Sequence, residues 1–166
     1  MTTNNWAAFE KAEPEFAEQV HHRFAQYPHH VLATLRKDGS PRVAGLTTEF
    51  RGGELWLGMM PGSLKAKDLQ RDPRFALHTN PGPDESMPDG DVRISGRAVE
   101  IVDPPEQHRF AEETGTEHPF HLFRTELTEV VHIAVAGDEL VIRSWTPERG
   151  LRTLHRGNDD EPPRED

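Results

Sequence analysis

The stretch HHVLATLRKDGSPRVAGLTTEFRGGELWLGM, residues 29–59, contains three short segments with the composition of β-strands, separated by two tight turns. Strands are predicted over residues 29–36, 42–50 and 54–59, and Asp38-Gly39 has the sequence of a hairpin turn. Because such turns join neighbouring antiparallel strands, the stretch predicts a meander rather than a strand–helix–strand unit.

The next stretch, MPGSLKAKDLQRDP at residues 60–73, is typical of a short helix in which Ser63 is the N-cap. Lys65 and Lys67 fall in the first turn, where the helix macrodipole disfavours cations by roughly 0.3–1 kcal/mol each. Two interpretations follow. Either both lysines point into water, or an anion binds at the helix start, where Gly62, Ser63 and Lys65 would form a phosphate cradle.

The remaining sequence predicts further short strands and two more helices. Helices are expected over residues 14–26 and from Pro104 or Pro105, and residues 117–126 are expected to form a short helical turn. The further strands are predicted over residues 74–80, over 92–102 with a bulge or bend at Gly96, and in a final hairpin around Gly137-Asp138. About seven antiparallel strands with two or three connecting helices indicate a barrel or a sandwich.

The 166 residues are enough for one domain, which is expected at residues 14–156. Residues 1–13 are interpreted as an N-terminal arm. Residues 157–166, GNDDEPPRED, form an acidic, proline-containing tail that is predicted to be disordered.

Charge and composition narrow the classes of function. The net charge of −10 argues against binding nucleic acid through its phosphates. Residues 30–79 nevertheless carry eight Lys or Arg against five Asp or Glu, which favours a compact anionic ligand for this segment. The chain has no cysteine, so thiolate chemistry and disulfides are excluded, and the ten histidines show no spacing that predicts a metal site.

The sequence also bears on cellular location. No apolar run approaches the length of a membrane span, and the first sixteen residues lack the apolar region of a signal peptide. A cytoplasmic protein without membrane segments is therefore expected, and the absence of cysteine suits that reducing compartment.

The ordered set of strand, DGSP turn, strand beginning with Arg42, strand, GS-x-K, helix, DPR and strand resembles the pyridoxamine 5′-phosphate oxidase-like family of FMN-binding split barrels. The resemblance is strongest over residues 30–79 and weaker over residues 92–152. It implies a mainly β fold, a six- to seven-stranded antiparallel Greek-key split barrel with two or three flanking helices. It also implies a homodimer with cofactor sites at the interface.

The same resemblance implies a set of cofactor-binding residues. The arginine would reach the flavin phosphate, the segment after it would run along the isoalloxazine ring, the helix start would grip the phosphate, and a tryptophan on a late strand would lie near the cofactor. In this sequence the matching residues are Arg42, Val43, Ala44, Gly45, Thr47, Met59, Met60, Gly62, Ser63, Lys65, Lys67 and Trp145. No catalytic residue is implied, because the cofactor carries the hydride chemistry.

The function implied by the resemblance is a flavin-dependent oxidoreductase that binds FMN and transfers hydride to or from a small-molecule substrate. Leu64 stands where vitamin-processing members have arginine, and Arg149, Arg152 and His155 do not reproduce their terminal Arg-x-His-x-Arg. Oxidation of pyridoxamine phosphate is therefore not expected. The alternatives are a reductase that uses the deazaflavin coenzyme F420, a non-enzymatic flavin- or heme-binding protein, and a barrel without a cofactor.

Overall fold

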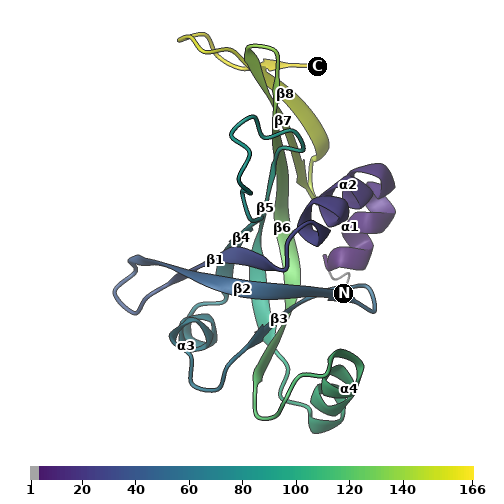
Figure 1. Cartoon of the computed structure of the whole chain (residues 1–166), viewed down its shortest axis with the longest axis vertical. Helices are drawn as coiled ribbons and strands as arrows, with labels where there is room; N and C mark the ends of the chain where they lie inside the picture. The colour runs from purple at the N-terminus through teal and green to yellow at the C-terminus, as the bar shows by residue number, and fades with distance from the viewer. Residues whose placement is uncertain (1–3) are drawn as a thin grey trace.

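Six antiparallel strands form a closed barrel in the computed structural model, which describes residues 4–166 (Figure 1). The strands are β1 (His29–Leu35), β2 (Pro41–Arg51), β3 (Glu54–Met59), β4 (Arg74–His78), β5 (Asp91–Glu100) and β6 (His121–Ala136). Their order is β3-β2-β1-β4-β5-β6, and β6 pairs again with β3 to close the barrel. The predicted mainly β split-barrel fold is confirmed.

Three further strands extend the sheet from β6, whose sixteen residues continue beyond the barrel. They are β7 (Glu139–Thr146), β8 (Gly150–Arg156) and β9 (Arg164–Glu165), paired in that order. In Figure 1 they form a ribbon that leads away from the barrel toward the C-terminus. The hairpin of β6 and β7 around Gly137-Asp138 agrees with the prediction, whereas β8 and β9 were not predicted.

The acidic tail differs from the disordered segment that its composition predicts. β9 pairs with β8 in the register His155↔Arg164. Arg152 Nε lies 2.8 Å from Glu165 Oε1, and Arg164 Nη2 lies 2.9 Å from Glu139 Oε1. Charged contacts rather than apolar ones hold the tail, so hydrophobic patterning gives no sign of them.

Within the described residues, four helices flank the sheet. α2 (Pro14–Ala25), α3 (Leu64–Arg71) and α4 (Pro104–Thr114) match the predicted helices. α1 (Trp6–Ala12) lies in the segment that was interpreted as an arm. Asn5 caps α1 by accepting a hydrogen bond from the Ala8 amide at 3.0 Å, and Trp6 and Phe9 on this helix are buried. The first described residues are therefore part of the folded body.

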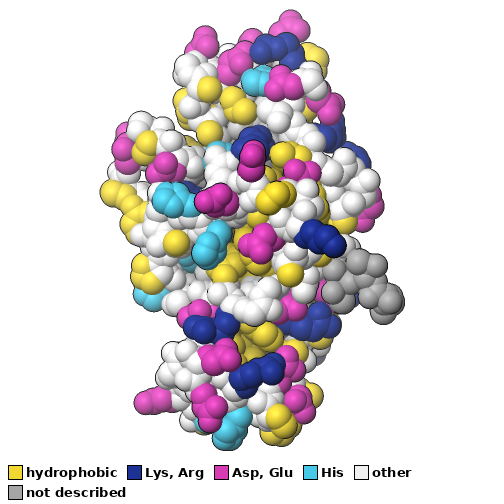
Figure 2. All heavy atoms as spheres, turned by 90° about the vertical axis from the view of Figure 1, so that its right-hand side faces the viewer, with side chains coloured by type: hydrophobic (Ala, Val, Ile, Leu, Met, Phe, Trp, Pro, Cys, Tyr) yellow, Lys and Arg dark blue, Asp and Glu magenta, His cyan; other side chains and the backbone are white. Residues whose placement is uncertain are grey.

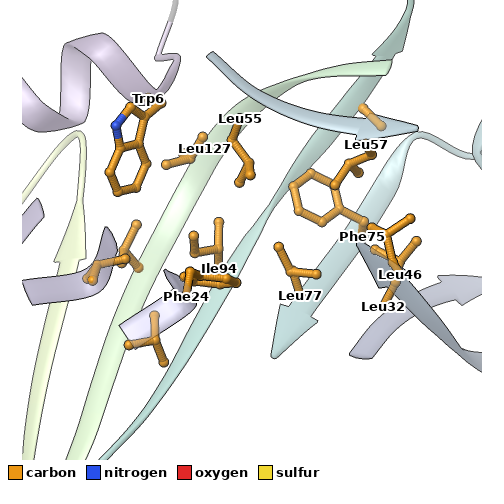
Figure 3. Packing of buried hydrophobic residues seen from close by; sticks show 14 of the residues in the cluster. Trp6, Phe24, Leu32, Leu46, Leu55, Leu57, Phe75, Leu77, Ile94 and Leu127 are labelled. Carbon is orange, nitrogen blue, oxygen red and sulfur yellow. The ribbon is translucent and has the colours of Figure 1, made fainter. Parts of the chain in front are cut away.

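The core lies inside the barrel and continues under α1 and α2. Figure 3 shows Trp6 of α1 and Phe24 of α2 beside strand residues such as Leu127 and Ile94. Burial alternates along β1 and β5, so their inward side chains fill the barrel as the period of two requires. At Gly96 the register of β5 against β6 shifts, as predicted, and a Cβ there would collide with the Glu126 carbonyl oxygen.

The helical turn predicted over residues 117–126 is wrong, because β6 begins at His121 and pairs with both β3 and β5. Leu122 and Phe123 are both buried although they point to opposite faces. Phe123 lies in the main core, and Leu122 packs in a second cluster with Trp56 and Phe110. A strand covered on both faces loses the alternation of apolar and polar residues, which is the signal on which a strand prediction depends.

Within residues 4–166, no helix is both long enough and apolar enough to span a membrane.

Candidate functional site

The start of α3 presents a group of hydrogen-bond donors. The Lys67 amide donates to the Ser63 carbonyl at 3.1 Å, so the amides of residues 64–66 have no acceptor within the helix. Ser63 has the extended backbone of an N-cap, as predicted, but its hydroxyl makes no capping bond. The Ser63 Oγ is buried and has no hydrogen-bond partner within the described residues. The helix start therefore has unused capacity for an acceptor such as a phosphate oxygen.

Asp68 links α3 to the neighbouring strands. Its carboxylate is 3% exposed and accepts from Arg42 Nε at 2.6 Å, Thr34 Oγ1 at 2.7 Å and Arg71 Nη2 at 3.0 Å. Burial acts to raise the pKa of Asp68, but hydrogen bonds from Arg42, Thr34 and Arg71, together with the Arg42 charge, outweigh it and the pKa lies below its ordinary value. Asp68 is therefore ionised at neutral pH and fixes the side chain of Arg42.

Arg42 keeps part of its binding capacity free. Its Nε is used by Asp68, and within residues 4–166 its two Nη nitrogens have no hydrogen-bond partner. The side chain is 20% exposed, so these nitrogens can be reached from solvent. A guanidinium that is fixed at Nε and free at both Nη atoms is well suited to bind an oxyanion.

The outer face of β2 is open beside this helix. Val43 is 69% exposed, and Gly45 and Thr47, which alternate with it along the strand, are also exposed. Ala44 points the other way and is half-buried. The Lys65 ammonium donates to the Gly45 carbonyl at 3.0 Å, which places it at the edge of this strand. The stripe of Val43, Gly45 and Thr47 is therefore a narrow open surface with a cation at its edge.

A basic cleft of about 560 Å³ lies between α3 and the turn that joins β1 to β2. Its basic residues are Arg36, Lys37, Arg42, Lys67 and Arg71, and its acidic ones are Asp38 and Asp68. Lys67 lines this cleft with Leu64, three positions earlier, whereas Lys65 reaches β2. The two lysines of the first turn therefore serve different surfaces.

The sequence identified some of these residues and missed others. Arg36, Lys37 and Asp68 were not among the predicted site residues. Positions 64, 67, 68 and 71 share a helix face, and the register Leu35↔Pro41 places the hairpin turn next to Arg42. The hairpin register could have found Arg36 and Lys37, whereas the role of Asp68 depends on how α3 packs on β1 and β2.

The other predicted residues are distributed unevenly. Met59 is 4% exposed and belongs to the core, whereas Met60 beside it is 78% exposed. Gly62 has φ +70°, a backbone angle that glycine adopts without strain, and its amide donates to His121 Nε2 at 3.1 Å. Met60 is therefore exposed just before α3, and Gly62 connects that turn to β6 through His121.

Within one chain, Trp145 lies far from the start of α3. On β6, Trp145 pairs with Val130 whereas Met59 pairs with His121, a separation of about 30 Å at roughly 3.3 Å per residue. Trp145 is 4% exposed, and its ring lies 4.8 Å from that of Phe9. Helix α1, in the segment that was interpreted as an arm, covers this ring.

Within residues 4–166, no three His, Asp or Glu side chains form a group that could hold a metal ion.

Several solved protein structures have a fold similar to that of this chain. PhzG from Burkholderia lata 383, solved with tetrahydrophenazine-1-carboxylic acid, superposes with a TM-score of 0.60 at 15% identity, covering 90% of this chain and 92% of that one. The heme storage protein HutZ from Vibrio cholerae gives 0.53 at 17% identity over 70% and 89% of the chains. A conserved hypothetical protein from Mycobacterium tuberculosis gives 0.52 at 24% identity over 81% and 84%. At these identities the likeness shows the fold alone.

Comparison with curated protein sequences gives no match. A family model described as pyridoxamine 5′-phosphate oxidase matches residues 16–135, from α2 to the end of β6. That segment is well over half of the chain and contains the whole barrel. The chain therefore belongs to the pyridoxamine 5′-phosphate oxidase family.

Proposed function

We propose that this chain is a flavin-dependent oxidoreductase that binds FMN, with the phosphate at the start of α3 and the ring system against the outer face of β2. The observation that carries the proposal is a set of unused donors on and around the first two turns of α3, beside an open strand face. These donors are the amides of residues 64–66, the unpartnered Ser63 hydroxyl and the free Nη nitrogens of Arg42. Backbone amides and a guanidinium are the groups that bind phosphate monoesters in proteins.

Each part of this site has a distinct task. A bound flavin supplies the hydride transfer itself. Arg42 and Lys65 provide positive charge for the phosphate, and Asp68 holds Arg42 in place. Gly45 has open space where a Cβ would stand, so the strand face beside it can be approached closely. None of these residues is assigned a proton-transfer role, and the proposed substrate is a small molecule.

A homodimer is part of the proposal. Three large apolar side chains near the site are exposed, namely Val43, Met60 and Leu64, at 69%, 78% and 58%. Exposed apolar surface around a binding site is commonly covered by a second subunit. Light scattering of the purified protein at micromolar concentration is expected to give twice the 18.8 kDa mass of the chain. A monomer would remove the two-chain cofactor site.

The basic cleft favours a second candidate, a reductase that uses F420. That coenzyme carries a phosphate and a longer anionic tail, and the cleft adds Arg36, Lys37 and Lys67 to the charges at the helix start. The absorption spectrum of freshly purified protein separates flavin from deazaflavin. It also identifies heme, the ligand named for HutZ among the similar folds.

Lys65→Ala is expected to weaken FMN binding roughly ten- to hundredfold, because one charge-assisted hydrogen bond contributes about 1.5–3 kcal/mol. Arg42→Ala is expected to act to the same extent. Fluorescence titration of the chain with FMN and with riboflavin measures the effect. The loss should be much smaller for riboflavin, which has no phosphate.

Lys67→Ala is the matched control, since it removes the same side chain two positions later, from the basic cleft that Lys67 lines with Arg42 rather than from the edge of β2 that Lys65 contacts. It should change FMN affinity little, but it should weaken F420 binding if the anionic tail lies in the basic cleft. Arg42→Ala also removes a partner of Asp68, so its fold is checked by circular dichroism before titration. Unchanged affinity of Lys65→Ala for FMN and F420 alike would refute the phosphate site.

A further inference from the structure

A second cavity, of about 480 Å³, lies between the β2–β3 turn and α4. It shares no lining residue with the basic cleft. Figure 2 shows dark blue and magenta side chains around a yellow area in the lower part of the molecule, where α4 lies. The cavity thus combines both signs of charge with an apolar surface.

The charges that line this cavity are balanced. They come from Arg51, Arg109 and Arg124 and from Glu54, Glu106 and Glu113. Among the described residues, the single ion pair within this set joins Arg51 Nε to Glu113 Oε2 at 3.8 Å, which is longer than a hydrogen bond. The three guanidinium and three carboxylate groups therefore make no close contact with one another. Outside this set, Arg124 Nη1 donates to Glu126 Oε1 at 3.4 Å, and Arg51 Nη2 lies 3.8 Å from Glu49 Oε2.

Two residues that line this cavity each have a polar atom without a hydrogen-bond partner, one a donor and the other an acceptor. Arg51 Nε and Glu54 Oε2 are buried and have no hydrogen-bond partner within residues 4–166. Arg51 and Glu54 are directly opposite each other in the β2–β3 hairpin, where opposite charges usually pair, yet no ion pair joins them. The other Glu54 oxygen accepts from Asn5 Nδ2 at 3.0 Å, which fixes the carboxylate. Buried polar groups without partners are rare, so an unpaired donor and an unpaired acceptor on two residues that line one cavity favour a ligand that supplies both once these side chains turn toward it.

Two aromatic rings form the apolar surface of this cavity. Trp56 is 8% exposed and Phe110 is 6% exposed, and their ring centroids lie 5.6 Å apart. The Trp56 indole nitrogen donates to the Arg51 carbonyl at 3.0 Å, so the ring is held in position. A hydrophobic group of modest size can pack here while charged groups of the same molecule reach the cavity's polar side chains.

We propose that this cavity binds a zwitterionic small molecule of the α-amino acid type with an aromatic or apolar side chain. Its carboxylate accepts hydrogen bonds from the arginines, its ammonium group donates to Glu54, and its side chain packs against Trp56 and Phe110. The equal numbers of arginine and glutamate favour a ligand that carries both charges, because each of its charged groups then meets side chains of opposite sign, whereas a singly charged ligand leaves the side chains of its own sign without a partner. This site is independent of the proposed flavin site.

The test compares three probes of similar size on the full, untagged chain without flavin. They are L-phenylalanine, 3-phenylpropanoate, which lacks the ammonium group, and phenethylamine, which lacks the carboxylate. Isothermal calorimetry is expected to show that phenylalanine binds at least about tenfold more tightly than either fragment, because each fragment loses one charge-assisted contact. Equal affinities, or no binding of phenylalanine at millimolar concentration, would overturn the proposal without any variant.

A pair of variants locates the site. Glu54→Gln keeps an acceptor for Asn5 but removes the charge, and it should weaken phenylalanine binding about tenfold while leaving 3-phenylpropanoate binding unchanged. Glu117→Gln is the matched control, since Glu117 lines a different cavity and should have no effect. Equal losses in both variants would show that phenylalanine binds elsewhere.

Discussion

Phe9→Ala is expected to lower the free energy of unfolding by about 3–5 kcal/mol, the range for truncating a fully buried phenylalanine. Phe9 is 0% exposed and lies at the centre of an aromatic group. Its ring is 5.2 Å from Trp6, 5.7 Å from Phe16 and 4.8 Å from Trp145, measured between centroids. Removing it leaves a cavity where α1, α2 and β7 meet, and these elements are tied to the barrel, so the cavity cannot close fully.

Urea unfolding followed by tryptophan fluorescence measures the loss. Glu10→Ala is the matched control, because it is exposed on the same helix and alanine preserves helix propensity. It should change stability by no more than about 0.5 kcal/mol. A Phe9→Ala loss as small as that of the control would show that α1 does not pack on the body in solution, as the interpretation of residues 1–13 as an arm supposes.

The importance of α1 could not be read from the sequence because the helix is short. Its seven residues contain only two apolar anchors, Trp6 and Phe9, and that is too few to show a helical period. Asn5 is a good N-cap, but a cap without a following periodic segment is weak support for a helix. The burial of Trp145 could not be predicted for the same reason, because the ring is covered by Phe9 of α1.

The barrel strands were predictable where tight turns separate them. The Asp38-Gly39 turn and the glycines at 52 and 53 define β1, β2 and β3 within a residue or two of the structure. The start of β6 and the whole of β8 were not predictable in this way. β6 is covered on both faces near His121, and β8 is evenly half-buried, so neither shows clear alternation.

The residues of the candidate site also differ in how far the sequence could predict them. Ser63, Lys65 and Arg42 carry local signals, namely a cap, a helix start and a strand start after a turn. Asp68 carries none, because its role depends on which strands α3 covers. Only the fold shows that its carboxylate meets Thr34 of β1 and Arg42 of β2. The residue that positions the site is therefore the one that sequence patterns could not supply.

Asp68→Asn is expected to destabilise the protein by about 3 kcal/mol, the lower end of the range for breaking a buried ion pair. The substitution keeps the shape of the side chain but leaves the charge of Arg42 without its partner. The lower end applies because Arg42 is 20% exposed and Arg71 is 37% exposed, so water can solvate both in part. The FMN affinity should also fall, though less than in Arg42→Ala, because Arg42 is present but no longer fixed.

The pH dependence of stability identifies the charge as the cause. Because the pKa of Asp68 is lower in the folded chain than its ordinary value, the parent keeps this contribution above the ordinary carboxyl pKa and loses it as pH falls toward the folded value. Asp68→Asn has no carboxylate to protonate and so does not lose this stability in acid. When the free energy of unfolding is plotted against pH, the curves of the parent and of Asp68→Asn should therefore converge below about pH 4. Asp72→Asn is the matched control, since its ion pair with Arg74 is at the surface and should contribute much less at neutral pH. If unfolding curves at pH 7 show the same loss in both variants, or if the difference between parent and Asp68→Asn persists unchanged in acid, Asp68 does not act through its charge on Arg42.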